Sequence, residues 1–495
     1  MAVTEPTAEG TDRERRAVHE GILRRQSAHE SSARTYARAL PIVPVRARGL
    51  TIEGADGRRY LDCLSGAGAL ALGHNHPVVL EAVRGVLDSG APLSVLDLAT
   101  PVKDAFVTEL FRTLPPALAA RARVQFCGPA GTDAVEAALK LVRAATGRTG
   151  LLAFTGAYHG MTAGALAASG GARDVQVTRL PYPQDYRCPF GIGGPRGAEL
   201  GVRWTESLLD DPKSGVPLPA GMILEPVQGE GGVIPAPDDW LRRMRRLTAD
   251  RSVPLIVDEV QTGVGRTGAF WAVDHSGITP DVMVLSKAIG GSLPLAVIVY
   301  RDDLDVWQPG AHAGTFRGNQ LAMAAGTATL AHVRANGLAA RAAALGSRML
   351  TRLRRDLGAF PCVGEVRGRG LMMGVEMVDP EREGAGLAEA PPADDSLPMP
   401  STPAHPEPTA VRTPRPAAPE LATAVQRECL RRGLIVELGG RHAAVVRLLP
   451  PLTISDEQAE AVLDRLTDAV AAAARDHERH GPDHPRHQGP AQRTG

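Results

Sequence analysis

Short apolar runs alternate with helical patterns through the middle of the chain. Runs rich in apolar and β-branched side chains, with the length of buried strands, lie at residues 151–154, 222–227, 255–260 and 282–286. Residues 134–146 and 240–250 instead repeat apolar positions at helical spacing. This alternation predicts an α/β domain built on a mostly parallel sheet, with a ligand at the carboxyl ends of the strands.

The pattern changes after about residue 319, where a long Ala-rich helical stretch leads into a smaller α+β region. Its strand-like runs, 370–377 and 433–437, are separated by a stretch crowded with Pro, Ala, Ser and acidic residues. Such a stretch cannot bury enough apolar surface to offset the entropy of ordering, so we expect it to be disordered. The predicted parts are a disordered N-terminal tail (1–28), an N-terminal segment of the small domain (29–75), a large ligand-binding domain (76–330), a C-terminal small domain (331–475) with its insertion at about 379–419, and a disordered tail (476–495).

Charge and hydropathy exclude several classes of protein. The 495 residues carry 55 basic and 55 acidic side chains, and this zero formal charge disfavours a charge-driven nucleic-acid binder. The N-terminal residues lack the apolar core of a signal peptide, and the apolar runs are too short to span a bilayer. We therefore expect neither nucleic acid nor a membrane as a partner.

The cysteines and histidines indicate neither a disulfide framework nor a metal site. The five cysteines are scattered and form no Cys-x-x-Cys pair, which favours a reducing, cytoplasmic setting. His74 and His76 stand close together, but no third ligand accompanies them. The four histidines of the tail are interrupted by Pro and Gly, which oppose a fixed geometry. No metal is therefore predicted.

Polar residues follow two neighbouring strands of the predicted sheet. Asp258 and Gln261 end the run PLIVDEVQTG, and a buried carboxylate there needs a cationic partner, which a purely structural ion pair would also supply. Lys287 follows the next strand, at the same edge, where partial desolvation lowers the pKa of an amine. Together Lys287 and Asp258 suggest pyridoxal phosphate, whose aldehyde carbon the lysine binds and whose pyridine nitrogen the aspartate keeps protonated.

A phosphate group would then need a cradle. Gly131 and Thr132 stand directly before a predicted helix, whose first backbone N–H groups can bind an anion. Taken alone, this signal is explained equally well by an ordinary helix cap.

Several long runs carry a family resemblance. They include ESSARTYARALP, SGAGALALGHNHP, GPAGTDAVEAALKLVRAATGRT, FTGAYHGMT, EPVQGEGGV, DEVQTGVGRTG and HAGTFRGNQLAMAAG. Over residues 31–453, outside the insertion, the chain resembles the class III aminotransferases, and within that class the diaminobutyrate–2-oxoglutarate aminotransferases. The resemblance implies a fold-type I, aspartate aminotransferase-like architecture with a mostly parallel seven-stranded sheet in the large domain.

The resemblance also implies roles for the residues around the cofactor ring. Lys287 would be the Schiff-base lysine and Asp258 the partner of the pyridine nitrogen. Gln261 would bind the phenolic oxygen, and Tyr158 would stack on the ring, since an aromatic face supports a flat, electron-poor pyridinium.

A second group of residues would hold the cofactor phosphate. Gly131 and Thr132 would bind it from one subunit, and Thr315 would reach it from the neighbouring subunit. A homodimer with shared active sites is therefore expected, and a higher oligomer is compatible with it.

Two residues are implied in substrate binding. Arg447 matches the arginine that receives the α-carboxylate of glutamate or 2-oxoglutarate, a planar task suited to guanidinium, and Glu230 matches the glutamate that pairs with it for the other substrate. Without the resemblance, a structural ion pair would be the favoured interpretation of Arg447. Met161 stands where ornithine and 4-aminobutyrate aminotransferases have an arginine for the distal carboxylate. Arg34 and Arg38 are candidates to replace that arginine, and a core position is the alternative for Met161.

The expected reaction is amino transfer from L-glutamate to L-aspartate 4-semialdehyde, giving L-2,4-diaminobutyrate and 2-oxoglutarate. Three alternatives stay open at this point. One is an aminotransferase for ornithine, 4-aminobutyrate or lysine. The second is an aminomutase or epimerase that uses the same cofactor, and the third is a non-catalytic protein that keeps the fold.

Overall fold

The computed structural model describes residues 12–171, 176–382 and 413–480. The central part of the expected Pro-rich insertion and all residues after 480 lie outside these ranges, so disorder there stays a prediction. The described flanks of the insertion meet each other, because the Asp379 N–H donates to the Pro416 carbonyl at 2.9 Å. The expected limits of 379 and 419 were therefore too wide, since this backbone pairing fixes both flanks. The limits of the other parts stay predictions, apart from the two terminal tails.

Helices occupy part of both segments that were expected to be disordered tails. Residues 12–28 were expected to be disordered, but they belong to helix α1 (Asp12–His29), which is rich in good helix formers and carries the i,i+4 pair Glu20–Arg24 at 3.5 Å. Helix α13 (Asp456–His480) likewise runs through the first five residues of the expected C-terminal tail. In both places helix propensity outweighs a polar composition.

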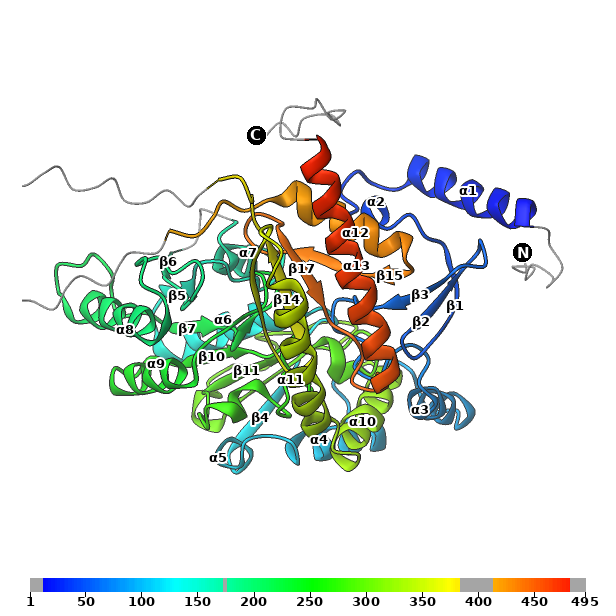
Figure 1. The fold of residues 1–495 in the computed structure, drawn as a ribbon. Helices are drawn as coiled ribbons and strands as arrows, with labels where there is room; N and C mark the ends of the chain where they lie inside the picture. The colour runs from blue at the N-terminus through cyan, green and yellow to red at the C-terminus, as the bar shows by residue number, and fades with distance from the viewer. Residues whose placement is uncertain (1–11, 172–175, 383–412, 481–495) are drawn as a thin grey trace, which may run out of the picture.

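Seven strands form the central sheet, and Figure 1 labels most of them. The neighbouring strands of β11, β10, β7, β5 and β6 pair in parallel, whereas β12 runs antiparallel to β11 and to β4. The predicted mostly parallel seven-stranded sheet is therefore confirmed. In spatial order the strands are β4 (Ala122–Phe126), β12 (Val297–Arg301), β11 (Val282–Leu285), β10 (Leu255–Asp258), β7 (Gly221–Leu224), β5 (Leu151–Phe154) and β6 (Val177–Leu180).

The apolar strands of this sheet are buried on both faces. In β10, Ile256 faces the cluster that contains Leu139 of helix α6 (Gly131–Thr146). Leu255 and Val257 face the larger cluster that contains Trp240 of helix α9 (Asp238–Asp250). Successive strand side chains point to opposite faces, so a strand covered on both sides reads as a continuous apolar run. This explains why the sequence pattern located the strands closely.

Two smaller sheets of four strands bring the chain ends together. In the first, β3 pairs in parallel with β15, which joins an N-terminal strand to a C-terminal one. In the second, β17 lies between β14 and β16. Their strands are β1 (Pro44–Arg48), β2 (Thr51–Gly54), β3 (Arg59–Asp62) and β15 (Leu434–Ile435), then β13 (Val363–Arg369), β14 (Met372–Met377), β17 (Val445–Leu448) and β16 (Glu437–Gly439); β8 (Val227–Gln228) and β9 (Ile234–Pro235) form a separate pair.

Helices cover these sheets, and the long C-terminal helix α13 crosses in front of the small sheets in Figure 1. Within the described ranges no helix is both long enough and apolar enough to cross a membrane. The remaining helices are α2 (Tyr36–Ala39), α3 (Pro77–Asp88), α4 (Pro101–Phe111), α5 (Pro116–Ala119), α6 (Gly131–Thr146), α7 (Ala163–Ser169), α8 (Gly194–Asp210), α9 (Asp238–Asp250), α10 (Gln320–Ala335), α11 (Leu338–Leu357) and α12 (Pro419–Arg431), with 3₁₀ turns η1 (Ala272–His275), η2 (Lys287–Gly290) and η3 (Asp302–Leu304).

Candidate active site

A cavity of 260 Å³ opens at the carboxyl ends of β10 and β11. Parallel strands bring their carboxyl ends to one edge of a sheet, which is where ligands bind in open α/β folds. Seven of the residues predicted from the sequence line this cavity together: Gly131, Thr132, Tyr158, Glu230, Asp258, Gln261 and Lys287.

Lys287 is held in a strained conformation at the end of β11. Its backbone φ is +51°, a region that side-chain-bearing residues seldom adopt outside functional sites. Its Nζ donates a hydrogen bond to the carbonyl of Ala67 at 3.0 Å, and the same carbonyl accepts from Gln261 Nε2 at 3.2 Å. Burial lowers the pKa of the Lys287 amine, which favours the neutral, nucleophilic form.

Asp258 is the last residue of β10, and a buried histidine fixes its orientation. His159 Nδ1 lies 2.8 Å from Asp258 Oδ2, and the Val260 N–H donates to Asp258 Oδ1 at 3.0 Å. Burial by itself lowers the pKa of His159, but the hydrogen bond and negative charge of Asp258 outweigh burial and raise it above its ordinary value. The sequence did not single out His159, although it directly follows Tyr158.

A second buried carboxylate, that of Glu225, also lines the cavity. It accepts the Tyr158 N–H and the Gly229 N–H, both at 3.0 Å, and so ties two segments of the wall together. Burial raises the pKa of Glu225 to about 7. Sequence reasoning missed Glu225 too, although a charged residue between a buried strand and a proline was a usable signal.

The N-terminus of α6 faces the cavity with Gly131 and Thr132. The residue before the helix is Ala130, whose side chain cannot accept a hydrogen bond, so the first N–H groups of α6 need another acceptor. A Cβ at Gly160 would collide with Thr132, so glycine keeps the opposite wall clear. Thr132 Oγ1 and Thr162 Oγ1 lie 2.7 Å apart and link the two walls.

Arg447 lies beyond this cavity and reaches it through Glu230. Its side chain is fully buried, and Nη2 lies 2.7 Å from Glu230 Oε2 and 2.7 Å from Glu437 Oε2. Tyr36 donates its hydroxyl to Glu437 Oε1 at 2.6 Å. The predicted Arg447–Glu230 pair is therefore present, and the structure adds Glu437 and Tyr36, which the sequence did not identify. A charge inside the apolar run LIVEL was the available signal for Glu437.

Three predictions about neighbouring residues are wrong or unsupported. Met161 is not a core residue: it is 67% exposed and lines the cavity. Arg34 donates to Ser27 Oγ and Arg38 to the Ser32 carbonyl, and neither lines the cavity. Tyr36, between these two arginines, is the residue that approaches the site, because α2 directs it toward β16.

Thr315 is exposed and does not line the cavity of its own chain. It lies in the turn after Gly314, which approaches the backbone of Gly128 just before α6. Its predicted role across a subunit boundary stays a prediction.

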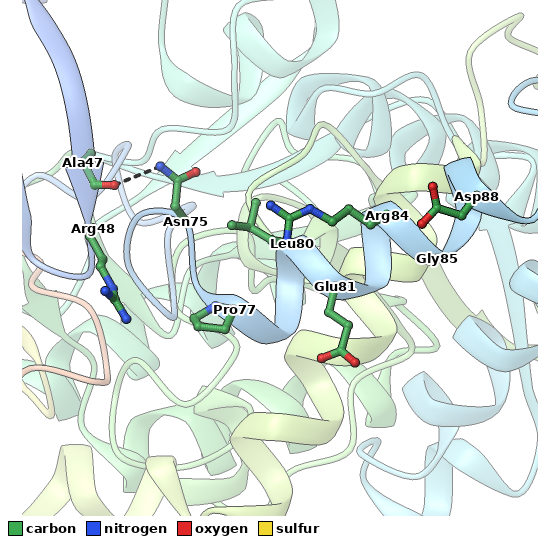
Figure 2. A pocket seen from close by; sticks show the side chains of 9 residues that line it. All are labelled: Ala47, Arg48, Asn75, Pro77, Leu80, Glu81, Arg84, Gly85 and Asp88. Carbon is green, nitrogen blue, oxygen red and sulfur yellow. Dashed lines mark hydrogen bonds between the residues drawn. The ribbon is translucent and has the colours of Figure 1, made fainter.

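A larger cavity of 750 Å³ lies elsewhere, between β1 and α3 (Figure 2). Figure 2 shows the Asn75 amide bonded to the Ala47 carbonyl at 2.9 Å, while Arg48 and Arg84 lie well apart and do not converge. Nearby, His74 is paired with Asp62 at 2.8 Å. This region therefore assembles no set of groups comparable to the one at Lys287.

The residues at the end of the large sheet fit pyridoxal phosphate. The uncapped start of α6 suits the phosphate, and the buried carboxylate of Asp258, held by His159, suits the ring nitrogen. Gln261 Oε1 is buried and has no hydrogen-bond partner among the described residues, which leaves the amide of Gln261 ready for a ligand.

Comparison with known proteins agrees with this geometry. The family model for class III aminotransferases matches residues 32–470. The chain belongs to the class III aminotransferases. It is accordingly an aminotransferase that depends on pyridoxal phosphate and has the fold-type I architecture. Both the resemblance and the fold expected from the sequence are confirmed.

Relatives and solved structures extend the match over nearly the whole chain. The diaminobutyrate–2-oxoglutarate aminotransferase of Rhizobium meliloti is 52% identical over 93% of this chain and 94% of its own length. That of Haemophilus influenzae is 44% identical over 92% and 96%. An (S)-enantioselective ω-transaminase from Thermomicrobium roseum superposes with a TM-score of 0.77 at 27% identity, over 92% of this chain and 98% of its own. A pyridoxal-phosphate-bound amine transaminase from an uncultivated Pseudomonas species gives 0.74 at 28%, over 90% and 98%.

Proposed function

We propose that this aminotransferase transfers the amino group of L-glutamate to L-aspartate 4-semialdehyde, forming L-2,4-diaminobutyrate and 2-oxoglutarate. The observation that carries the proposal is a pocket lined by Lys287, Asp258 and Glu230, with Arg447 paired to Glu230 directly behind it. The names of the relatives at 52% and 44% identity support this choice of substrates. The absence of an arginine at Met161 disfavours the ornithine and 4-aminobutyrate alternatives.

Pyridoxal phosphate supplies an aldehyde for the amino group and a ring that takes up the electrons of a broken C–H bond. Asp258 holds a proton at the ring nitrogen, which requires the carboxylate to stay charged and fixed. His159 orients Asp258 through their 2.8 Å contact. Gly131 and Thr132 bind the phosphate through the start of α6, and Tyr158 and Gln261 bind the ring and its phenolic oxygen.

Lys287 moves the proton in each half of the reaction. With the cofactor bound, its amine would take the proton from the substrate carbon that bears the amino group and would return it on the cofactor side of that C–N bond. Burial lowers the pKa of this amine, which favours the neutral form that accepts the proton. The hydrogen bond to the Ala67 carbonyl positions the Lys287 amine when it is not bonded to the cofactor.

Arg447 and Glu230 let one pocket accept two unlike substrates. The α-carboxylate of glutamate binds Arg447 in place of Glu230, because a guanidinium can bind a carboxylate through two parallel hydrogen bonds. When the amino-aldehyde substrate occupies the pocket, Glu230 returns to Arg447 and neutralises it. The 2.7 Å pair in the structure corresponds to this second arrangement.

A homodimer with shared sites is part of the proposal. Thr315 of the partner subunit would complete the phosphate site, since Thr315 is exposed in its own chain. The neighbouring Phe316 is 69% exposed and Leu98 is 66% exposed, apolar surface that a partner would cover. Mixed dimers of Lys287→Ala and Thr315→Asp subunits test this arrangement. They should regain one working site if Thr315 acts across the boundary, and none if it acts within its own subunit.

A cytoplasmic location is also proposed. All five cysteines are free, and four of them are buried. Burial raises the pKa of Cys127 and of Cys429 to about 12, so these thiols are unreactive and fit a reducing compartment.

Product identification tests the proposed reaction. The protein with its cofactor is mixed with glutamate and aspartate 4-semialdehyde, beside reactions in which ornithine or 4-aminobutyrate replaces glutamate. Diaminobutyrate and 2-oxoglutarate should form in equal amounts. Product formation without consumption of glutamate would instead indicate an aminomutase, and faster turnover of ornithine would reassign the substrate. The Lys287→Ala variant controls for chemistry without the enzyme.

A further inference from the structure

Arg447, Glu230 and Glu437 form a cluster of charged side chains beside the pocket. The proposed reaction gives roles to Arg447 and Glu230 but none to Glu437. It is the first residue of β16 and stands directly opposite Arg447 in the antiparallel pairing with β17. Residues opposite each other on neighbouring strands point to the same face, so the register itself brings the two side chains together. Glycine at position 439 leaves room for the Arg447 side chain, because a Cβ at Gly439 would collide with it.

The cluster carries a surplus of negative charge. One guanidinium, that of Arg447, faces two carboxylates, Glu230 and Glu437, through the same nitrogen. Its Nε and Nη1 have no hydrogen-bond partner among the described residues, so Arg447 keeps donors for a substrate carboxylate. Arg447 therefore needs only one of the two glutamates as a counter-ion, and a cation would balance the other.

Two neighbours fix the orientation of the Glu437 carboxylate. The Tyr36 hydroxyl donates to Oε1 at 2.6 Å, and Oε2 faces Arg447 Nη2 at 2.7 Å. The charges of Glu437 and Lys287 act on each other: each shifts the pKa of the other toward the charged form, against the larger opposing effect of burial. Through the ion pairs of Arg447 with Glu437 and Glu230, the Glu437 carboxylate is linked to the wall of the cavity that Lys287 lines.

The substrates of the proposed function present a matching cation. L-2,4-diaminobutyrate differs from 4-aminobutyrate only by an ammonium group on the α-carbon, and one methylene separates that carbon from the carbon that bears the reacting amine. The ammonium must therefore bind near Lys287. A site that hydrogen-bonds a polar group rejects analogues that lack it, because its own buried group is left unpaired.

We propose that Glu437 binds the α-ammonium group of the diamino acid through Oε2 and thereby determines specificity for diaminobutyrate over 4-aminobutyrate. This inference rests on the proposed function. Glu230 then exchanges with the glutamate carboxylate at Arg447, while Glu437 serves the diamino acid. Tyr36 acts as a positioning residue that holds the Glu437 carboxylate.

The Glu437→Gln variant tests this assignment, because glutamine keeps the size of the side chain and an acceptor for Tyr36 but removes the charge. Binding of L-2,4-diaminobutyrate and of 4-aminobutyrate is measured by calorimetry in a Lys287→Ala background, which separates binding from turnover. The Kd for diaminobutyrate should rise about 10- to 100-fold, and that for 4-aminobutyrate should stay within about 3-fold, as expected for loss of a charged hydrogen bond. In the otherwise wild-type enzyme, kcat/KM should change in the same ratio. Glu437→Asp should lose less than Glu437→Gln.

Asp305→Asn provides a matched control, because Tyr300 donates to Asp305 at 2.9 Å in a similar pair outside the residues that line the cavity. It should leave the ratio of the two Kd values unchanged. Equal weakening of both amines by Glu437→Gln would overturn the proposal, as would a rise confined to the KM for 2-oxoglutarate, which would make Glu437 only a support for Arg447. If the wild-type enzyme converts neither amine, the proposed function itself fails, and the binding ratio still tests Glu437.

Discussion

The cofactor side and the substrate side of the pocket are built from different parts of the chain. Asp258 and Lys287 end neighbouring strands of one sheet, so their separation is set by strand pairing within a single layer. Arg447 and Glu230 are 217 residues apart and belong to a small sheet and to the loop after β8. One sheet therefore sets the positions of Asp258 and Lys287, whereas the substrate side depends on how two sheets and the N-terminal segment pack together.

This difference indicates which side can vary independently. A change at Asp258 or Lys287 alters the chemistry common to all substrates. A change at Arg447, Glu437 or Tyr36 alters only which molecule is held in place. Substitutions on the two sides should consequently separate loss of chemistry from loss of selectivity.

The largest effect is expected from Lys287→Ala. Without the amine, no group is positioned to move the proton, so kcat should fall by at least about 10⁴-fold, and the absorbance of the covalently held cofactor should disappear. Stopped-flow assays and absorbance spectra measure both. Binding of 2-oxoglutarate, which belongs to the substrate side, should stay within about 3-fold of wild type. Retained transamination would assign proton transfer to another residue.

Asp258→Asn should have the next largest effect. The amide cannot hold the positive charge at the ring nitrogen, so kcat should fall about 10²- to 10⁴-fold while cofactor still binds. The pKa of His159 should also fall, because the hydrogen bond and charge of Asp258 raise it in the wild type, and only the smaller effect of Glu225 would then oppose burial. NMR titration of the His159 ring measures this shift. A near-normal rate would remove Asp258 from the chemistry.

The cofactor side was largely predictable from sequence. A buried strand that ends in Asp258 and its neighbour that ends in Lys287 are local patterns, and parallel pairing brings such ends together. The helix start at Gly131 is equally local. His159 and Glu225 were missed because Asp258, the charged neighbour of both, comes close to them only when the ends of three strands lie side by side in the fold.

On the substrate side, only the residues that match motifs of the family could be predicted from the sequence. Resemblance located Arg447 and Glu230, but the register that places Glu437 opposite Arg447 is not encoded in either strand alone. Tyr36 contacts Glu437 across 401 residues, so no local pattern reveals it. The core position considered as the alternative for Met161 is wrong for a related reason, since an apolar side chain that lines a cavity resembles a core residue in the sequence.

Arg447→Lys should impair only the substrate side. Lysine keeps the charge but cannot bind a carboxylate through a planar pair of donors, so the KM for glutamate and for 2-oxoglutarate should rise about 10- to 100-fold. Cofactor affinity and its absorbance spectrum should be unchanged. Steady-state kinetics with each substrate varied in turn would measure the two KM values, and a cofactor titration would show whether cofactor affinity is unchanged. A weakened cofactor would contradict the independence of the two sides.

The smallest effect concerns Glu259, which directly follows Asp258 but points into the core, where it accepts from Val273 N–H and from the Thr262 hydroxyl. Burial raises its pKa from 4.5 to about 7. Between these values the folded state keeps a proton that the unfolded state has released, so the free energy of unfolding falls as pH rises from 4.5 to 7. Glu259→Gln removes this titration. The free energy of unfolding of the variant should therefore fall less than that of the wild type over this pH range, by on the order of 1 kcal/mol.

Urea unfolding at pH 5, 6, 7 and 8 compares the two proteins. Glutamine can replace both hydrogen bonds of Glu259, because the Thr262 hydroxyl can accept as well as donate. Glu225, whose pKa is also about 7, titrates over the same range and should leave a remaining slope in Glu259→Gln. Parallel stability curves for the two proteins would show that Glu259 is ionised in the folded state throughout, and that the cofactor side tolerates a buried charge next to Asp258 without cost to the fold.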